Sequence, residues 1–257
     1  MAERKVALVT GAASGIGLAI TRLLGERGMA VAAVDNNAEE LERNVGKLTA
    51  DGLDVVPVEA DVCSSEDAEA AVETAQNRQG PLDHLVNAAG IMRMGRSWDL
   101  DDRAWEQSVA VNASGVFTMS RAAARQMVPR ASGSIVTVAS NAAETPRTGF
   151  AAYCASKAAA AMFTRCLGLE LAEHGIRCNV VAPGSTDTPM LRAMWKDESG
   201  ARATLDGSPE TYRLGIPLGR IASPQNVADS VLFLLSDRAS HITMHTLTVD
   251  GGATLGT

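Results

Sequence analysis

The stretch Val6-Ala-Leu-Val-Thr-Gly-Ala-Ala-Ser-Gly-Ile-Gly17 decides the fold of this chain. A short apolar run, 6–10, precedes glycines spaced as TGxxxGxG, and the helical apolar pattern Leu18, Ile20, Leu23, Leu24 follows. Strand, glycine turn and helix in this order let the backbone approach a pyrophosphate, which then faces the positive end of the helix. The alternative is a plain turn between strand and helix, but this placement favours a dinucleotide site.

The rest of the chain repeats the alternation of strand and helix. Strands are expected at 29–34, 53–58, 82–86, 133–139, 176–181 and 246–249, and helices at 39–50, 65–79, 100–127, 151–173 and 224–235. This pattern predicts an α/β fold, a doubly wound parallel sheet of about seven strands with helices on both faces. The irregular stretch at about 188–217 is interpreted as a substrate lid.

Composition excludes several classes of protein. The chain has 257 residues, 46% of them hydrophobic, and no linker or repeat, which indicates one domain over 1–257. A net charge of −7 without a basic stripe argues against a nucleic-acid partner, and no signal peptide or membrane span is visible. Cys63, Cys154, Cys166 and Cys178 form no CxxC pair, so we expect reduced thiols, a cytoplasmic location and no metal site.

Polar and small residues follow the expected strands, at the edge where such sheets bind ligands. Asp35 ends the second strand, where a carboxylate accepts hydrogen bonds from the ribose and repels a 2′-phosphate. No arginine stands beside it, so NAD is favoured over NADP, although Asp35 could instead cap the next helix. Asp61 and Val62 follow the third strand, where the adenine edge is expected.

Tyr153 and Lys157 stand four residues apart in an Ala-rich helical run, so their side chains share one face. A free phenol titrates near ~10, and an ammonium one turn away favours the phenolate by roughly two pKa units. The pair therefore suits proton abstraction from an alcohol, although YxxxK also occurs on helices without function. Asn112, in the middle of an expected helix, is either a tolerated surface residue or a site where the helix opens and holds a water.

These residues together resemble the short-chain dehydrogenase/reductase family over essentially the whole chain. The resemblance rests on 10–17, Asn87-Ala-Ala-Gly90, Asn112, Ser140, Tyr153-Cys-Ala-Ser-Lys157 and Pro183-Gly184. It implies a Rossmann-type fold, a Tyr153 base, a Ser140 that binds the reacting oxygen, a Lys157 that holds the ribose, and an Asn112 water relay. It also implies that NAD is held by Gly11, Ser14, Gly15, Ile16, Gly17, Asp35, Asp61, Val62, Asn87, Ala88, Gly90, Tyr153, Lys157, Pro183, Gly184, Thr186 and Thr188. The one departure is Ala88, where many members carry a second Asn.

A narrower resemblance points to members that oxidise 2,3-dihydro-2,3-dihydroxybenzoate to an aromatic siderophore precursor. It is carried by 87–95, 136–149, 177–188, 214–221 and 249–256. Asn141 and Glu144 stand where that subgroup is expected to carry Asp and His, so 2,3-dihydro-3-hydroxyanthranilate is an alternative substrate. The sequence is also compatible with a generic cyclic alcohol or sugar dehydrogenase, and with a non-catalytic NAD-binding protein.

A carboxylate substrate calls for a cation in the pocket. Arg147 and, as the weaker candidate, Arg93 lie in loops near the site, and either could instead be a surface arginine. An apolar slot for the ring is expected from Met92, Met94, Met190 and Trp195. Asn141 and Glu144, which flank the catalytic serine, are further expected substrate-binding residues. By resemblance the protein is a homotetramer that pairs helices 100–127 and 151–173, with 246–256 packed across a second axis.

Overall fold

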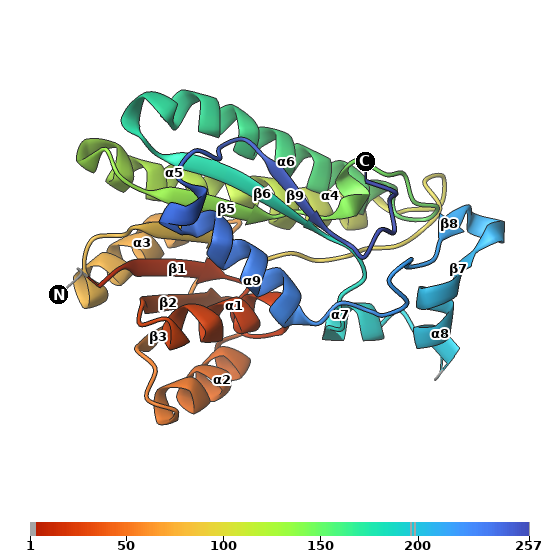
Figure 1. The fold of residues 1–257 in the computed structure, drawn as a ribbon, viewed down its shortest axis with the longest axis horizontal. Coiled ribbons are helices and arrows are strands. Elements are labelled where there is room, and N and C mark those ends of the chain that lie inside the picture. The colour runs from red at the N-terminus through yellow and green to blue at the C-terminus, as the bar shows by residue number, and fades with distance from the viewer. Residues whose placement is uncertain (1–3, 196, 198, 257) are drawn as a thin grey trace.

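The computed structural model describes residues 4–195, 197 and 199–256. Its centre is a parallel seven-stranded sheet in the order β3-β2-β1-β4-β5-β6-β9 (Figure 1). The order reverses between β1 and β4, and such a switch point opens a crevice at the carboxyl ends of the strands. The strands span β1 Val6–Thr10, β2 Ala30–Asp35, β3 Val55–Glu59, β4 His84–Asn87, β5 Ser134–Val138, β6 Arg177–Pro183 and β9 Thr246–Val249.

Helices cover both faces of the sheet, so the central strands β1 and β5 are buried at every residue. One face packs against α3 (Ser65–Gln79), α5 (Gly115–Met127) and α6 (Ala151–Leu171). The other packs against α1 (Gly15–Glu26), α2 (Ala38–Ala50) and α9 (Pro224–Leu235). The expected doubly wound architecture is confirmed.

The helix expected as one unit over 100–127 is interrupted. It comprises α4 (Asp102–Val109), a π-helical turn at Ala110–Ser114, and α5. Asn112 lies in the π-helical turn, so the helix opens at the residue with poor helical propensity.

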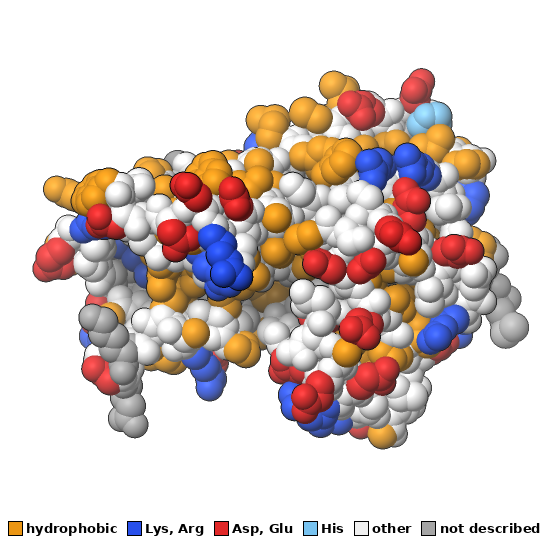
Figure 2. Space-filling view, turned by 180° about the vertical axis from the view of Figure 1, so that it is seen from behind, with side chains coloured by type: hydrophobic (Ala, Val, Ile, Leu, Met, Phe, Trp, Pro, Cys, Tyr) orange, Lys and Arg blue, Asp and Glu red, His pale blue; other side chains and the backbone are white. Residues whose placement is uncertain are grey.

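The 188–217 stretch has more regular structure than its sequence pattern indicated. It forms α7 (Pro189–Arg192), α8 (Ser199–Asp206) and an antiparallel pair, β7 (Gly207–Ser208) with β8 (Arg213–Leu214). These elements project beyond the carboxyl edge of the sheet (Figure 1). We call this stretch the lid segment; its residues 196 and 198 lie outside the described residues. Seen from behind, the surface is hollowed between this projection and the body of the molecule (Figure 2).

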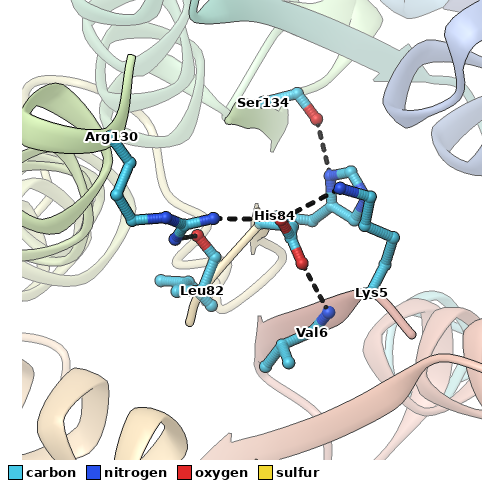
Figure 3. A network of polar contacts seen from close by, with 7 residues as sticks. Lys5, Val6, Leu82, His84, Arg130 and Ser134 are labelled. Carbon is cyan, nitrogen blue, oxygen red and sulfur yellow. Dashed lines mark hydrogen bonds and ion pairs between the residues drawn. The ribbon is translucent and has the colours of Figure 1, made fainter. Parts of the chain in front are cut away.

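A polar network lies at the opposite edge of the sheet (Figure 3). The buried Asp83 carboxylate accepts hydrogen bonds from the backbone N–H of Val6 at 2.9 Å and from Arg130 at 3.1 Å. His84 Nδ1 lies 2.8 Å from Ser134 Oγ, and burial lowers the pKa of His84 to about 4. The network therefore holds a neutral imidazole between β4 and β5.

This histidine predicts a loss of stability in acid. Because the pKa of His84 is about 4 in the folded chain and near 6.5 in the unfolded chain, protons bind the unfolded state first as pH falls from 7. The free energy of unfolding should drop by about 2–3 kcal/mol from this group between pH 7 and 4.5. Urea unfolding of His84→Asn should show that much less pH dependence, and the exposed His241→Gln should behave as wild type. Equal pH dependence in all three proteins would contradict the assignment.

Candidate active site

A cavity of about 700 Å³ opens at the carboxyl ends of β4, β5 and β6. The strands deliver Gly90, Ser140 and Pro183 to its inner wall, and α6 adds Tyr153 and Lys157. The lid segment supplies much of the outer wall. Side chains that are distant in sequence therefore converge because parallel strands all end at one edge.

The Ser140 hydroxyl lies beside the Tyr153 phenol and affects its titration. Burial raises the pKa of Tyr153, and the Ser140 hydroxyl opposes that shift. Ser140 Oγ also accepts from the backbone N–H of Ala142 at 3.1 Å, which fixes the hydroxyl at the start of a short 3₁₀ turn. The pair presents a phenol and a hydroxyl side by side to one reacting oxygen.

The net lowering of the Tyr153 pKa that the sequence predicts is not found, because burial raises this pKa by more than the nearby Lys157 offsets. The Lys157 ammonium lies 5.9 Å from the centroid of the Tyr153 ring, and it donates to the carbonyl of Val138 at 2.9 Å. Burial lowers the pKa of Lys157 to about 8. Desolvation is therefore the largest cause of the pKa shift of both groups. The four-residue spacing in the sequence carries no information about how deeply the two side chains are buried.

Asn112 connects the β4 loop to α6. Its Oδ1 accepts from the backbone N–H of Ile91 at 2.8 Å, and its Nδ2 donates to the carbonyl of Ile91 and to Ser156 Oγ, both at 2.9 Å. Gly90 lies directly beside it, because a Cβ there would be 3.2 Å from Asn112 Oδ1 and 3.1 Å from Lys157 Nζ. The opened helix thus holds the glycine loop against the lysine.

The glycine turn after β1 forms a cradle that fits a dinucleotide. A Cβ on Gly17 would lie 2.0 Å from the carbonyl oxygen of Gly11, and one on Gly11 would lie 2.7 Å from Ala89 Cα. Gly11 and Gly15 have φ of 67° and 53°, which favour glycine. Ser14 makes no side-chain cap to α1, so no serine oxygen occupies the N–H groups that face a bound phosphate.

Asp35 ends β2 beside this cradle. Its carboxylate accepts from the backbone N–H of Ala13 and of Asn37, each at 3.0 Å. Asn37, rather than Asp35, caps α2 by accepting from Glu40 N. The alternative role of Asp35 as the helix cap is therefore wrong.

The remaining expected cofactor residues divide into two groups. The following lie around the cavity or the cradle: Ile16, Ala88, Gly184, Thr186 and Thr188. Asp61 lines a second cavity of about 340 Å³ past β3, while Val62 is buried beside it. The amide of Asn87 is buried and donates to Ser120 Oγ at 2.9 Å, so its side chain joins β4 to α5 instead of facing the cavity.

The expected substrate residues also divide. Arg147, Met92, Met190, Trp195 and Asn141 line the cavity, and Asn141 Nδ2 donates to Asp250 at 3.1 Å. Arg93, Met94 and Glu144 do not line it. Arg93 Nε donates to Gln107 at 3.2 Å, Met94 is half-exposed, and Glu144 lies 3.8 Å from Arg165.

Sequence reasoning missed a second guanidinium in the cavity. Arg213 of β8 lines it and donates from Nη2 to Ser185 Oγ at 2.8 Å. The only sequence signal for Arg213 is its place directly before the 214–221 run. Its contact with Ser185, 28 residues away, depends on how the lid segment folds back.

Comparisons with known proteins agree with this geometry. A model of the family described as short chain dehydrogenase matches residues 5–199. The chain is 53% identical to the 2,3-dihydro-2,3-dihydroxybenzoate dehydrogenase of Bacillus subtilis strain 168, over 99% of this chain and 97% of that protein. It is 45% identical to the enzyme of the same name in Escherichia coli K12, over 96% of each chain. It also resembles the crystal structure of a variant actinorhodin polyketide ketoreductase with NADPH, with a TM-score of 0.90, 36% identity and coverage of 98% and 99%.

Proposed function

This chain belongs to the short-chain dehydrogenase family, and we propose that it oxidises 2,3-dihydro-2,3-dihydroxybenzoate at C3 to give 2,3-dihydroxybenzoate. The observation that carries the proposal is one cavity with Ser140 and Tyr153 at its inner end and a guanidinium, Arg147, on its wall. Identity of 53% to a dehydrogenase of that name supports the hydroxy substrate over the amino analogue. The intact serine, tyrosine and lysine support catalysis over cofactor binding alone.

The residues act on the C3 hydroxyl. Ser140 Oγ and Tyr153 Oη hold the oxygen, and Tyr153 accepts its proton as the hydride leaves C3. The nicotinamide, when bound, is the hydride acceptor. Lys157 favours the phenolate that Tyr153 must carry before it accepts this proton, since its ammonium lies 5.9 Å from the centroid of the ring. The resulting ketone loses its C2 proton and aromatises, which makes the reaction effectively one-way.

We propose a role for the lid segment and a boundary for the domain. Met190 and Trp195 come from the lid segment and, with Met92 of the β4 loop, supply an apolar slot for the ring. The lid segment covers the reacting carbon and excludes water. The hydrophobic cores on the two faces of the sheet are built on the same seven strands. This shared sheet supports a single domain over 1–257.

The preferred cofactor should be NAD⁺. Asp35 places a carboxylate at the ribose end of the cradle, and among the described residues no Lys or Arg forms an ion pair with it. A 2′-phosphate there would face a like charge, so kcat/KM for NAD⁺ should exceed that for NADP⁺ by about a hundredfold. Steady-state kinetics with both cofactors tests this, and equal values would contradict it.

The function is tested by assaying reduction of the cofactor with three substrates. We expect rapid turnover of the dihydrodiol carboxylate, slower turnover of 2,3-dihydro-3-hydroxyanthranilate, and little with a neutral cyclic diol of the same ring size. A preference for the neutral diol would overturn the proposal in favour of a general alcohol dehydrogenase.

We also propose a homotetramer in the cytoplasm. The exposed faces of α5 and α6 carry Phe117, Met162 and Leu169, and hydrophobic side chains gather along that edge of the molecule (Figure 2). The small residues Ala155 and Ala159 permit close approach of a second α6. A single species of about four chain masses in light scattering is expected.

The proposed location rests on the cysteines. All four are free thiols, which suits a reducing compartment. Among the described residues no helix is long and apolar enough to span a bilayer.

A further inference from the structure

Two arginines from distant parts of the chain line one cavity. Arg147 lies in the loop between Ser140 and α6, and Arg213 lies in β8 of the lid segment. Both side chains are half-buried, and burial together with the charge of Arg147 lowers the pKa of Arg213. Two like charges on one partly desolvated wall repel each other, so a bound anion would relieve that repulsion.

Arg213 is held in place from the sheet side of the cavity. Ser185, its hydrogen-bond partner at 2.8 Å, follows β6 within the cavity wall. The guanidinium is therefore positioned by a residue next to Gly184 and not only by the short β7–β8 pair. A side chain that is fixed in this way loses little further entropy when it binds a ligand.

The pairing of the cavity arginines differs from that of the arginines on the outside of the lid segment. Arg192 and Arg202 reach Asp187 and Asp206. Among the described residues, no ion pair joins Arg147 or Arg213 to a carboxylate. Asp197 also lines the cavity, where its Oδ1 accepts from the backbone N–H of Ser199 at 2.8 Å.

We propose that Arg213, together with Arg147, binds the carboxylate of the substrate, so that Arg213 is a specificity-determining residue of the lid segment. This inference rests on the proposed function. In a cyclohexadiene carboxylate the carboxyl-bearing C1 is two bonds from the reacting C3. Anchoring the carboxylate between the two arginines therefore fixes which hydroxyl faces Ser140 and Tyr153. The same anion would tie the lid segment to the catalytic loop.

Substrate kinetics of Arg213→Gln test the proposal. We expect KM for the dihydrodiol carboxylate to rise about ten- to a hundredfold, the effect of losing one charge-assisted contact. kcat/KM for a neutral cyclic diol should change by less than about threefold. Arg202→Gln, which removes an exposed arginine from the same lid segment, is the matched control and should leave both values unchanged. Equal losses for both substrates in Arg213→Gln would overturn the proposal.

Ligand binding separates this inference from the proposed function. With the cofactor-loaded enzyme, benzoate should bind wild type more tightly than benzamide, and Arg213→Gln should lose about tenfold or more for benzoate alone. Arg213→Lys keeps the positive charge but lacks the two parallel N–H donors of a guanidinium, so it should recover part of the lost affinity. This recovery would show that the loss in Arg213→Gln does not come from misfolding. If the enzyme does not oxidise the dihydrodiol but loses benzoate affinity in Arg213→Gln, the proposed function is wrong and the anion site is retained. If the dihydrodiol is oxidised but Arg213→Gln binds benzoate as tightly as wild type, the proposed anion site is wrong and the proposed function is retained.

Coupling between the two arginines gives a second criterion. If both contact one carboxylate, the loss of benzoate affinity in the Arg147→Gln/Arg213→Gln double variant should be smaller than the product of the two single losses. Strictly multiplicative losses would show that the arginines act at separate places and would overturn the shared site.

Discussion

Replacing Tyr153 with Phe should lower kcat by about 10²–10⁴ while the affinity for the cofactor changes little. The phenol lines the cavity beside Ser140, where we propose that its oxygen binds the reacting hydroxyl and accepts the proton. Its removal leaves the ring, its packing and the Lys157 contact in place. Single-turnover rates and cofactor titration on the same preparation measure the two quantities separately.

The chain offers a matched control, since it contains only two tyrosines. Tyr212 is 93% exposed and lies beside Arg213, so Tyr212→Phe makes the same chemical change outside the site and should leave kcat unaltered. Retention of more than about a tenth of the wild-type kcat in Tyr153→Phe would contradict a general-base role.

Replacing Gly17 with Ala should nearly abolish cofactor binding. The added Cβ would lie 2.0 Å from the carbonyl oxygen of Gly11, so α1 must move away from the turn that it closes. Such overpacking costs about 1–3 kcal/mol of stability, and the cradle loses its shape. We expect the dissociation constant of the reduced cofactor to rise by at least about a hundredfold, as measured by fluorescence titration.

Gly46→Ala is the control for this change. Gly46 is exposed within α2, and nothing lies within 4 Å of a Cβ placed there. Alanine at that position should stabilise the fold by up to about 1 kcal/mol and leave cofactor binding unchanged. Cofactor affinity of Gly17→Ala within about threefold of wild type would rule out the cradle as the binding site.

The parts of the fold that follow from sequence are those with strong local signals. The helices Ser65–Gln79 and Pro224–Leu235 and the strand Thr246–Val249 have the expected bounds, because serine caps, Pro and Gly mark where they begin or end. The convergence of Ser140 and Tyr153 on one edge likewise follows from parallel strand order.

The parts that do not follow from sequence depend on contacts between distant residues. The π-helical turn at Asn112 is fixed by Ile91 and Ser156, and neither lies within one helical turn of it. Desolvation, which raises the pKa of Tyr153, depends on what surrounds the phenol. The same holds for two arginines, since only the folded chain shows that Arg93 bonds Gln107 and that Arg213 enters the cavity.

The most direct test of the central claim is the fate of deuterium placed at C3 or at C2 of 2,3-dihydro-2,3-dihydroxybenzoate. If Tyr153 and Ser140 act on the C3 hydroxyl, deuterium from C3 should appear in the reduced nicotinamide with a primary isotope effect on turnover. Deuterium from C2 should be lost to water, and both substrates should give unlabelled 2,3-dihydroxybenzoate. Transfer of the C2 label to the cofactor, or no aromatic product from either substrate, would contradict the account.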